Sequence, residues 1–409
     1  MWNEFVGWMA GSKYYYRTIF PAEAVWTLFA QRADAANREF ACEVEIGEGA
    51  VVWKRYESCK SPEELRRVVT GSAFKALHIG PSFSEAAHRA RVPGVVPMGK
   101  ELVFDLDLQD VAWFGVDKDD QQANDRFVRA TFASCHVLIE ILKEIMDFEH
   151  FLPVYSGRRG VHLWVLDERA FGWADEVRAA LCAFVAAEPS KDDPKVISTH
   201  HMRKNPSFGS MTQEALCRAE DVLIAPFQEG GVGLLDRKRD VTAFLDKVFD
   251  PEVDEKFEHA RTETRALAML ASSGKTGWDA FGSIENALKN NKFWHNRLRD
   301  VVFSLTWPAL DVGASAKQNH CTKSMFSLHA KTGRVAVPVP VHRLLSSAEE
   351  TMPPIVTLDE LKDDAHSHSR ALFDRGLSAL EVATRAMGNT HIRSMDIEDL
   401  CGSKRSREL

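Results

Sequence analysis

The sequence predicts a mixed α/β protein of the α+β class, in which a mainly α-helical subdomain interrupts the core. Strand-like and helix-like segments are interleaved before residue 170, the periodicity of 211–303 is helical, and strand-like sequence returns at 324–341. Strand side chains repeat every two residues and helical side chains every 3.6, so these patterns distinguish a sheet-containing core from a helical insertion. Apolar content of 45% and charged content of 27% are ordinary for a folded globular protein.

The length of 409 residues predicts two or three structural units. Between 188 and 210 the composition changes to Pro, Lys, Asp, Asn and Ser, which indicates a connection between units. We therefore divide the chain into residues 1–190 for the first part of the core, 191–303 for the helical subdomain, 304–345 for the second part of the core, and 346–409 for a C-terminal helix and polar tail.

The individual elements have local signals at their ends. Pro21 ends a first helix, and Ser61 followed by Pro62 starts another in the manner of an N-cap and first turn. The expected order is helices over 2–20 and 22–37, a hairpin of 41–46 and 50–53 that turns at Gly47 to Gly49, the helix from Ser61, strands at 76–80 and 101–108, a helix over about 126–147, a strand–turn–strand unit over 152–166, strands at 324–329 and 334–341, and a tail helix over about 368–387.

The cysteine spacing and the hydropathy of the sequence indicate the cellular compartment in which the protein is expected. Seven cysteines are scattered without a close pair, which argues against a disulfide framework and against a zinc knuckle. The first residues lack a cationic start, and no apolar run approaches the roughly 18 residues that a membrane-spanning helix needs. We therefore expect reduced thiols in a cytosolic or nuclear protein that is neither secreted nor inserted into a membrane.

The net charge of −8 by itself counts against nucleic-acid binding, because phosphate contacts need Lys and Arg. Charge acts locally, however, and residues 312–348 contain no Asp or Glu. One positive surface can therefore lie on an acidic molecule. The basic residues of this stretch are Lys317, Lys323, Lys331, Arg334 and Arg343.

Asp105 and Asp107 lie in the predicted strand 101–108. Because strand side chains alternate, the two carboxylates share one face, about 6.5 to 7 Å apart. Two like charges beside a half-buried sheet repel each other and lose hydration, so a cation between them would be stabilising. Oxygen ligands of this kind suit Mg²⁺ or Mn²⁺, and two such ions support in-line phosphoryl displacement. The alternative is a strand end with two solvated acids.

The segment 156–162 reads Ser-Gly-Arg-Arg-Gly-Val-His. Its glycines allow a tight turn that leaves Arg158, Arg159 and His162 beside exposed amides, and Arg grips phosphate oxygens with a bidentate fork. Such a cluster fits a nucleoside triphosphate, and the alternative is a solvated basic turn. Asp311 stands just before the acid-free basic stretch and could join the metal site, or it could be an ordinary surface helix cap.

Taken together, these segments resemble the small, catalytic subunit of archaeal and eukaryotic DNA primases. The similarity runs in family order from about residue 13 to 340, and the run Tyr-Ser-Gly-Arg-Arg-Gly-Val-His at 155–162 is quite specific. The blocks that resemble the family are 15–21, 38–40, 54–56, 101–108, 154–164 with Asp167 and Glu168, and 319–334.

The resemblance implies a primase-polymerase catalytic core with the helical subdomain inserted before the third aspartate. It implies that Asp105, Asp107 and Asp311 hold two Mg²⁺ or Mn²⁺ ions. The implied reaction is template-directed attack of a ribonucleotide 3′-hydroxyl on an α-phosphate, which releases pyrophosphate. The residues implied to hold the nucleotide are Ser156, Arg158, Arg159, His162, Lys323 and His329, with Arg55 near the same pocket.

The sequence departs from the family at two places. Eukaryotic relatives usually carry a four-cysteine zinc module after the paired aspartates, but here 115–125 is acidic and polar, with only Cys135 and His136 nearby. A structural zinc ion is coordinated by four ligands, so we expect no zinc to be bound there. His78 stands where relatives often have an acid near the nucleotide sugar, which leaves ribose recognition open.

The expected function is synthesis of RNA primers on single-stranded DNA for replication, from nucleoside triphosphates. The resemblance implies a primase large subunit as partner, within a polymerase alpha–primase complex, and a nuclear location, or a cytoplasmic one if the source has no nucleus. Two alternatives are a primase-polymerase of repair or damage tolerance that adds deoxynucleotides, and a non-catalytic scaffold subunit of a replication complex.

Overall fold

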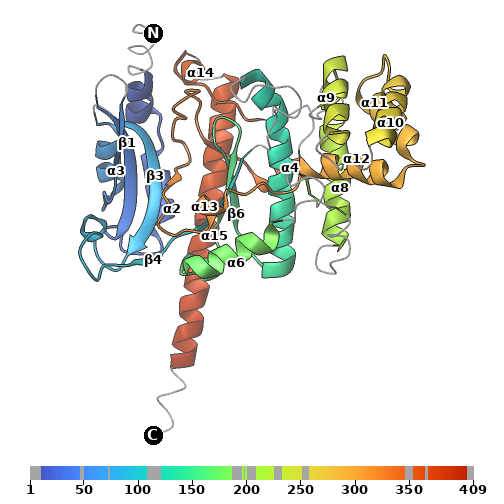
Figure 1. Cartoon of the computed structure of the whole chain (residues 1–409). Coiled ribbons are helices and arrows are strands. Elements are labelled where there is room, and N and C mark those ends of the chain that lie inside the picture. Colours follow the sequence, from blue (N-terminus) through green and yellow to red (C-terminus); the bar gives the residue numbers. More distant parts are fainter. Residues whose placement is uncertain are drawn as a thin grey trace.

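A computed structural model describes most of the chain, and Figure 1 shows it. The predicted turn at 47–49, the polar stretch up to residue 120 and most of the connection 188–210 lie outside the described residues. Of the helix expected over 2–20, residues 11–20 are described, and 11–18 are helical. The described ranges are 11–46, 50–71, 74–107, 121–186, 196–197, 199, 209–224, 233–250, 258–345, 353–363 and 367–402.

The first sheet is antiparallel and contains the expected hairpin. Its order is β2 (Val51–Lys54), β1 (Arg38–Glu45), β3 (Phe74–Phe83) and β4 (Pro97–Gly99). The short strand β8 (Thr322–Lys323) also pairs with β3, so residues from the far end of the core complete this sheet. Helices α2 (Ala22–Ala30) and α3 (Pro62–Val69) lie beside it (Figure 1). Ser61 caps α3 as predicted, because its hydroxyl accepts the N–H of Glu64 at 3.3 Å.

The second sheet has the order β5 (Leu102–Leu106), β7 (Val161–Val165), β6 (Phe151–Tyr155) and β9 (Val337–Pro338), all antiparallel. The predicted alternation of β5 is confirmed, because Leu102, Phe104 and Leu106 pack in the cluster that contains α4 (Gln121–Met146), while Val103 packs in the opposite one. Helices α5 (Glu168–Phe171) and α6 (Asp175–Val185) follow β7.

The described part of 209–304 is helical and has its own core around Phe244, Trp294 and Leu298. Phe127 and Ala130 of α4 join this cluster, so α4 connects the helices to the second sheet. The four-segment division of the chain stays a prediction. The helices are α8 (Gly209–Leu223), α9 (Lys238–Val248), α10 (Glu258–Ala271), α11 (Gly277–Leu288) and α12 (Lys292–Ser304).

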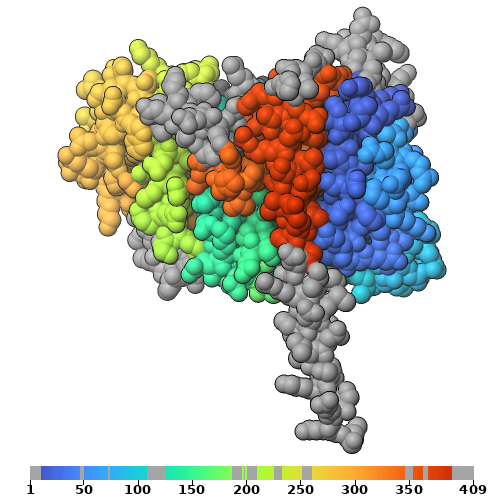
Figure 2. All heavy atoms as spheres, turned by 180° about the vertical axis from the view of Figure 1, so that it is seen from behind, coloured from blue at the N-terminus to red at the C-terminus, as the bar shows by residue number. Residues whose placement is uncertain are grey.

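The last part of the chain returns to the core through α13 (Val312–Ser315), β8, β9, the 3₁₀ turn η5 (Val341–Arg343) and α14 (Leu358–Asp363). The tail helix is longer than predicted, because α15 spans His368–Gly402. Its apolar residues Leu372, Phe373 and Leu380 are buried against this chain rather than left for another one. Seen from behind, α15 lies between the N-terminal region and the rest of the core (Figure 2).

Other predictions about element lengths were also wrong. The strand expected at 324–329 is only a bridge from Leu328 to Val335, with β8 lying just before it, and the strand expected at 334–341 is reduced to this bridge and β9. Pro338 and Pro340 lack the N–H that a ladder needs, which explains the short β9. The helix expected over 22–37 ends at Ala30, and Asp34 instead accepts the N–H of Ala36 in a turn. Among the described residues, no helix has the length and apolarity needed to cross a membrane.

Candidate active site

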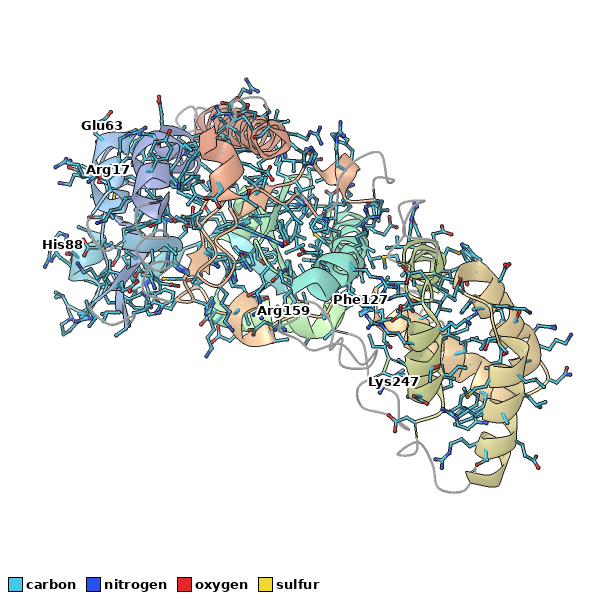
Figure 3. The ribbon with its side chains drawn as sticks, turned by 90° about the horizontal axis from the view of Figure 1, so that it is seen from above. Arg17, Glu63, His88, Phe127, Arg159 and Lys247 are labelled. Carbon is cyan, nitrogen blue, oxygen red and sulfur yellow. The ribbon has the colours of Figure 1, made fainter. Side chains whose placement is uncertain are left out.

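The two paired aspartates stand at the end of β5, in the middle of the molecule. Asp105 is directly opposite His162 in the β5–β7 ladder, and Asp107 follows the strand, with its N–H bonded to the carbonyl of Ala309 at 3.3 Å. Their side chains are 34% and 47% exposed, so both carboxylates are open to a ligand. Figure 3 shows Arg159 near this position, between the N-terminal sheet region that carries His88 and the helical region that carries Lys247.

The turn at 156–160 connects β6 to β7 and is closed by its own hydrogen bonds. Ser156 donates its N–H to the Gly160 carbonyl at 2.9 Å, and its hydroxyl accepts the Gly160 N–H at 3.1 Å. Gly157 has a φ of +87°, a conformation that favours glycine. A Cβ on Gly160 would lie 2.9 Å from the carbonyl oxygen of Leu106, so the turn packs tightly against β5.

This packing brings basic groups onto the aspartates. The guanidinium of Arg159 lies 2.7 Å from the Asp107 carboxylate, and Nε2 of His162 lies 3.6 Å from that of Asp105. Burial lowers the pKa of His162, although Asp105 opposes the shift, so the imidazole is neutral near pH 7. Its Nδ1 is buried and has no hydrogen-bond partner among the described residues.

Asp311 adjoins the pair through the backbone. Its N–H donates to the carbonyl of Asp105 at 2.9 Å, and Ser315 accepts the N–H of Asp105 at 3.0 Å. One carboxylate oxygen of Asp311 also accepts the N–H of Ala314 at 3.0 Å and so caps α13. Asp311 therefore caps a helix and also lies beside the aspartate pair, and its part in a metal site stays a prediction. The second oxygen of a capping carboxylate can still take a cation.

The side of the site that carries Asp105, Asp107 and the 156–160 turn is the second-sheet wall. The first sheet forms the facing side, the first-sheet wall. Lys323 of β8 pairs with His78 of β3, and burial lowers the pKa of Lys323 to about 8 against the opposing charges of Glu43 and Asp105. Burial, together with Lys323 and Arg158, lowers the pKa of His329 to about 3. Near pH 7 Lys323 therefore still carries a positive charge, whereas His329 is neutral.

The two walls enclose a cavity of about 360 Å³. Of the residues that the sequence singled out for the site, all except Asp311 and Arg55 line it. The lining residues are Trp53, His78, Val103, Asp105, Asp107, Ser156, Arg158, Arg159, Gly160, His162, Ala314, His320, Cys321, Thr322, Lys323 and His329.

The family is decided by a match of residues 104–341 to the model of the DNA primase small subunit. The chain belongs to this family. It is thus a nucleotidyltransferase of the primase type. The DNA primase small subunit of Drosophila melanogaster is 25% identical over 88% of this chain and 84% of its own length. That of Saccharomyces cerevisiae is 22% identical over 97% and 94%, respectively.

Among solved structures, the polymerase domain of Mycobacterium tuberculosis Ligase D in complex with DNA aligns with 87% of this chain and 91% of its own. The TM-score of 0.32 and the identity of 14% are too low to support an argument about fold or site.

In this primase small subunit, Arg55 lies just outside the cavity. Its guanidinium is held by the Glu39 carboxylate at 2.5 and 3.0 Å and reaches the carbonyl of Asn319 at 3.3 Å. The Glu39 hydrogen bond raises the pKa of Arg55, so its charge is permanent. The guanidinium thus contacts the residue before His320, which lines the cavity.

Sequence reasoning missed several residues of the first-sheet wall. Trp53 lines the cavity and packs on His78 with ring centroids 4.4 Å apart, and Glu43 accepts a hydrogen bond from Nε2 of His78 at 2.8 Å. Trp53 ends the predicted strand 50–53 and Arg55 follows it, so extending the strand alternation by two residues could have placed both on one face. No local signal joins Glu43 to His78, because their contact depends on the β1–β3 register.

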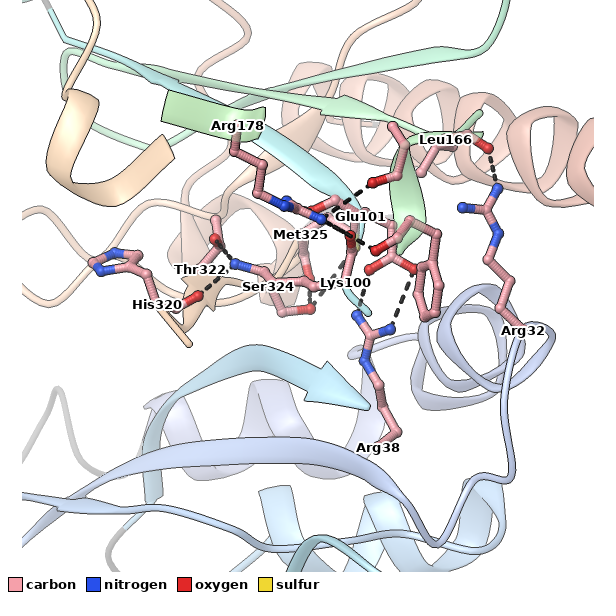
Figure 4. Close-up of polar contacts among 12 residues, drawn as sticks. Arg32, Arg38, Lys100, Glu101, Leu166, Arg178, His320, Thr322, Ser324 and Met325 are labelled. Carbon is pink, nitrogen blue, oxygen red and sulfur yellow. Dashed lines mark hydrogen bonds and ion pairs between the residues drawn. The ribbon is translucent and has the colours of Figure 1, made fainter. Parts of the chain in front are cut away.

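A buried charge cluster adjoins the same wall (Figure 4). Lys100 donates to the hydroxyl of Thr322 at 2.8 Å and to the carbonyl of His320. Burial lowers its pKa to about 7. Arg38 and Glu101 form a fully buried ion pair, and Arg178 donates to the Lys100 carbonyl. The cluster thus fixes the segment that leads into Lys323.

The paired aspartates offer a partial fit to metal ions. Asp105 and Asp107 share one face, with exposed carboxylate oxygens of the type that Mg²⁺ and Mn²⁺ prefer. Within the described part of the chain, no three His, Cys, Asp or Glu side chains are grouped as a ready metal site. Asp107 is paired with Arg159, so cation binding would need local rearrangement of this pair, whereas Asp311 has a second carboxylate oxygen beside its cap. The expected absence of zinc stays a prediction, because residues 108–120 are not described.

Proposed function

We propose that this chain synthesises short RNA primers on single-stranded DNA by nucleotidyl transfer. The observation that best supports the proposal is the cavity itself. Asp105 and Asp107 line it together with the basic groups of Arg158 and Arg159 on the same wall, and Lys323 lines it from the facing wall. A nucleoside triphosphate with its cations needs both kinds of group around one space.

Asp105, Asp107 and Asp311 would hold two Mg²⁺ or Mn²⁺ ions, whose charge supports in-line phosphoryl displacement. The chain's own contribution is to orient the triphosphate. Arg158 and Arg159 project from a turn fixed by Ser156 and Gly160, so little side-chain ordering is left for the moment of binding. Neutral His162 adds a hydrogen-bonding group without another positive charge.

Arg159 has two competing partners in this scheme. In the ligand-free arrangement it neutralises Asp107 at 2.7 Å. A bound triphosphate would offer it phosphate oxygens, which a guanidinium binds with a bidentate fork. Nucleotide binding would then free Asp107 for a cation, so substrate and cation binding would support each other.

The pair of His78 and Glu43 favours ribonucleotides. Burial lowers the pKa of His78, and its Nε2 faces the Glu43 carboxylate at 2.8 Å, so the neutral ring carries its proton on Nε2. Nδ1 is then an acceptor, and it is buried without a partner among the described residues. A sugar hydroxyl could donate to this nitrogen once a small movement of the His78 ring opens it to the cavity, whereas a deoxyribose lacks the 2′-hydroxyl. The alternative, a primase-polymerase that adds deoxynucleotides, would leave Nδ1 unsatisfied.

We further propose the assembly in which this chemistry operates. A small subunit implies a large one, so the partner would be a primase large subunit, within a polymerase alpha–primase complex. The nucleic-acid partners would be the single-stranded template and the growing RNA primer. The location would be the nucleus, or the cytoplasm if the source has none.

The proposal is tested by incorporation of labelled ATP on an oligothymidylate template with Mn²⁺, with and without template. We expect template-dependent RNA products, and a loss of about 10²- to 10³-fold for Asp105→Asn with an unchanged melting temperature. Asp279→Asn removes an exposed acid from α11 and is the matched control, which should keep full activity. An Asp105→Asn protein as active as wild type would refute the enzymatic proposal. Preference for dATP would instead support the deoxynucleotide alternative.

A further inference from the structure

A line of aromatic and basic side chains leaves the cavity along β3. It starts at Trp53, which lines the cavity over His78, and continues through Arg55 to Tyr56, whose ring lies 6.0 Å from that of Phe83. Positions 78 and 83 of β3 are about 17 Å apart at the usual strand rise. That distance equals several nucleotide steps at the ~3.4 Å spacing of a stacked strand. We call Trp53, Arg55, Tyr56 and Arg91 the β3 track.

The backbone of the track is held in an unusual conformation. Tyr56 has a φ of +68°, which is costly for a residue with a side chain. Glu39 fixes it, because one carboxylate oxygen accepts both the Tyr56 N–H at 2.9 Å and the Arg55 Nε–H at 2.5 Å. A Cβ at Gly80 would lie 2.4 Å from the other oxygen, so the glycine makes room for this clamp. Strain that the surroundings enforce so firmly is typical of a binding surface.

Arg91 is the basic residue at the outer end of the track. Its guanidinium lies over the Tyr56 ring at 5.3 Å, and that of Arg55 lies over the same ring at 5.0 Å. Arg91 is exposed and has no ion pair with any acid among the described residues. Arg89, two positions earlier on the same turn, is also exposed but is paired with Glu85. Arg91 is therefore a preorganised positive group that awaits an anion, on a chain whose net charge is −8.

We propose that the β3 track binds the single-stranded template DNA next to the catalytic cavity, with Arg91 on a template phosphate. This inference rests on the proposed function, because it places a nucleic acid beside the nucleotide cavity. A guanidinium group binds the phosphates of a nucleic acid, and unpaired bases stack on aromatic rings, so this combination suits a single strand. The template is the component that continues beyond the cavity in unpaired form, whereas the primer ends inside it and is paired.

The test uses the full chain and a fluorescent single-stranded oligothymidylate, followed by anisotropy at several salt concentrations. Arg91→Glu should bind this probe roughly fivefold to tenfold more weakly at low salt, with a shallower salt dependence by about one counterion. Arg89→Glu makes the same charge change on the same turn, and it should stay within about twofold of wild type. Both variants should show wild-type thermal stabilisation by ATP with Mn²⁺, since neither residue lines the cavity.

Several results would overturn the β3 track. They are equal losses for Arg89→Glu and Arg91→Glu, no loss for Arg91→Glu, no binding of the single strand by wild type, or a larger effect of Arg91→Glu on a blunt duplex than on the single strand. Failure of the proposed function would be seen separately, as a wild-type chain that binds the single strand but incorporates no nucleotide.

Discussion

The two walls of the cavity differ in how their charges are balanced. On the second-sheet wall, charged groups already have partners, since Arg159 lies on Asp107 and His162 lies near Asp105. On the first-sheet wall, burial lowers the pKa of Lys323, whose ammonium has no ion-pair partner among the described residues. The second-sheet wall is therefore close to neutral by itself, whereas the first-sheet wall carries the uncompensated ammonium of Lys323.

The difference follows from how each wall is assembled. The second-sheet wall consists of neighbouring strands and one glycine turn, so its residues lie together in the sequence as well as in space. The first-sheet wall joins β3 to the two-residue strand β8, far away in the chain, and depends on Lys100 for support. Bringing such distant segments together costs more conformational entropy than pairing neighbouring strands does.

The largest effect should come from Asp311, which adjoins the second-sheet wall without lining the cavity. Asp311→Asn should lower the rate of nucleotide incorporation by about 10²- to 10³-fold, because it removes a carboxylate proposed to hold cations. Asn is as good an N-cap as Asp, so the melting temperature should not change. Asp311→Ala, which also loses the cap, separates the two roles by an added loss of about 1 kcal/mol in unfolding free energy. Full activity of Asp311→Asn would restrict the acid to capping.

Arg159 should have the next largest effect. Arg159→Ala is expected to raise KM for ATP by roughly 10- to 100-fold, since a charge-assisted hydrogen bond contributes about 1.5 to 3 kcal/mol. Arg159→Lys should recover only part of this loss, because Lys cannot bind phosphate with a fork. Steady-state kinetics at saturating template measure both variants. An unchanged KM would mean that Arg159 serves Asp107 alone.

His78 tests the first-sheet wall. His78→Ala should reduce the preference for ATP over dATP by about tenfold, the size of one neutral hydrogen bond to the sugar. Glu43→Gln keeps the packing but removes the carboxylate that holds the proton on Nε2, so a smaller reduction is expected. Competition between the two nucleotides on one template gives the ratio directly. If both variants kept the wild-type ratio, ribose selection would lie elsewhere.

The smallest effect is a pH dependence from Lys323. With a pKa lowered to about 8, this ammonium loses its charge as pH rises, so nucleotide affinity should fall on the alkaline side. Between pH 7.5 and 8.5 the protonated fraction falls about threefold, and KM for ATP should rise by a similar factor. Lys323→Arg stays charged and should flatten this profile. A flat wild-type profile would show that Lys323 stays protonated or takes no part in binding.

The sequence predicted the second-sheet wall well and the first-sheet wall poorly. Strand alternation and a glycine turn are local signals, which were sufficient to bring Asp105, Asp107 and His162 together. The pairing of Glu43 with His78 and the support from Lys100 depend on register between distant segments. Arg55 was expected near the pocket but is bound by Glu39 at its edge, and such a competition between partners is visible only in three dimensions.

The support from Lys100 also bears on how this site can change in evolution. The ammonium group holds residue 320 by its backbone carbonyl and residue 322 by its side-chain hydroxyl. The side chain at 320 lines the cavity, so it can be exchanged to alter substrate preference without loosening the anchor. Position 322 has no such freedom, because only Ser or Thr would leave Lys100 an equivalent oxygen.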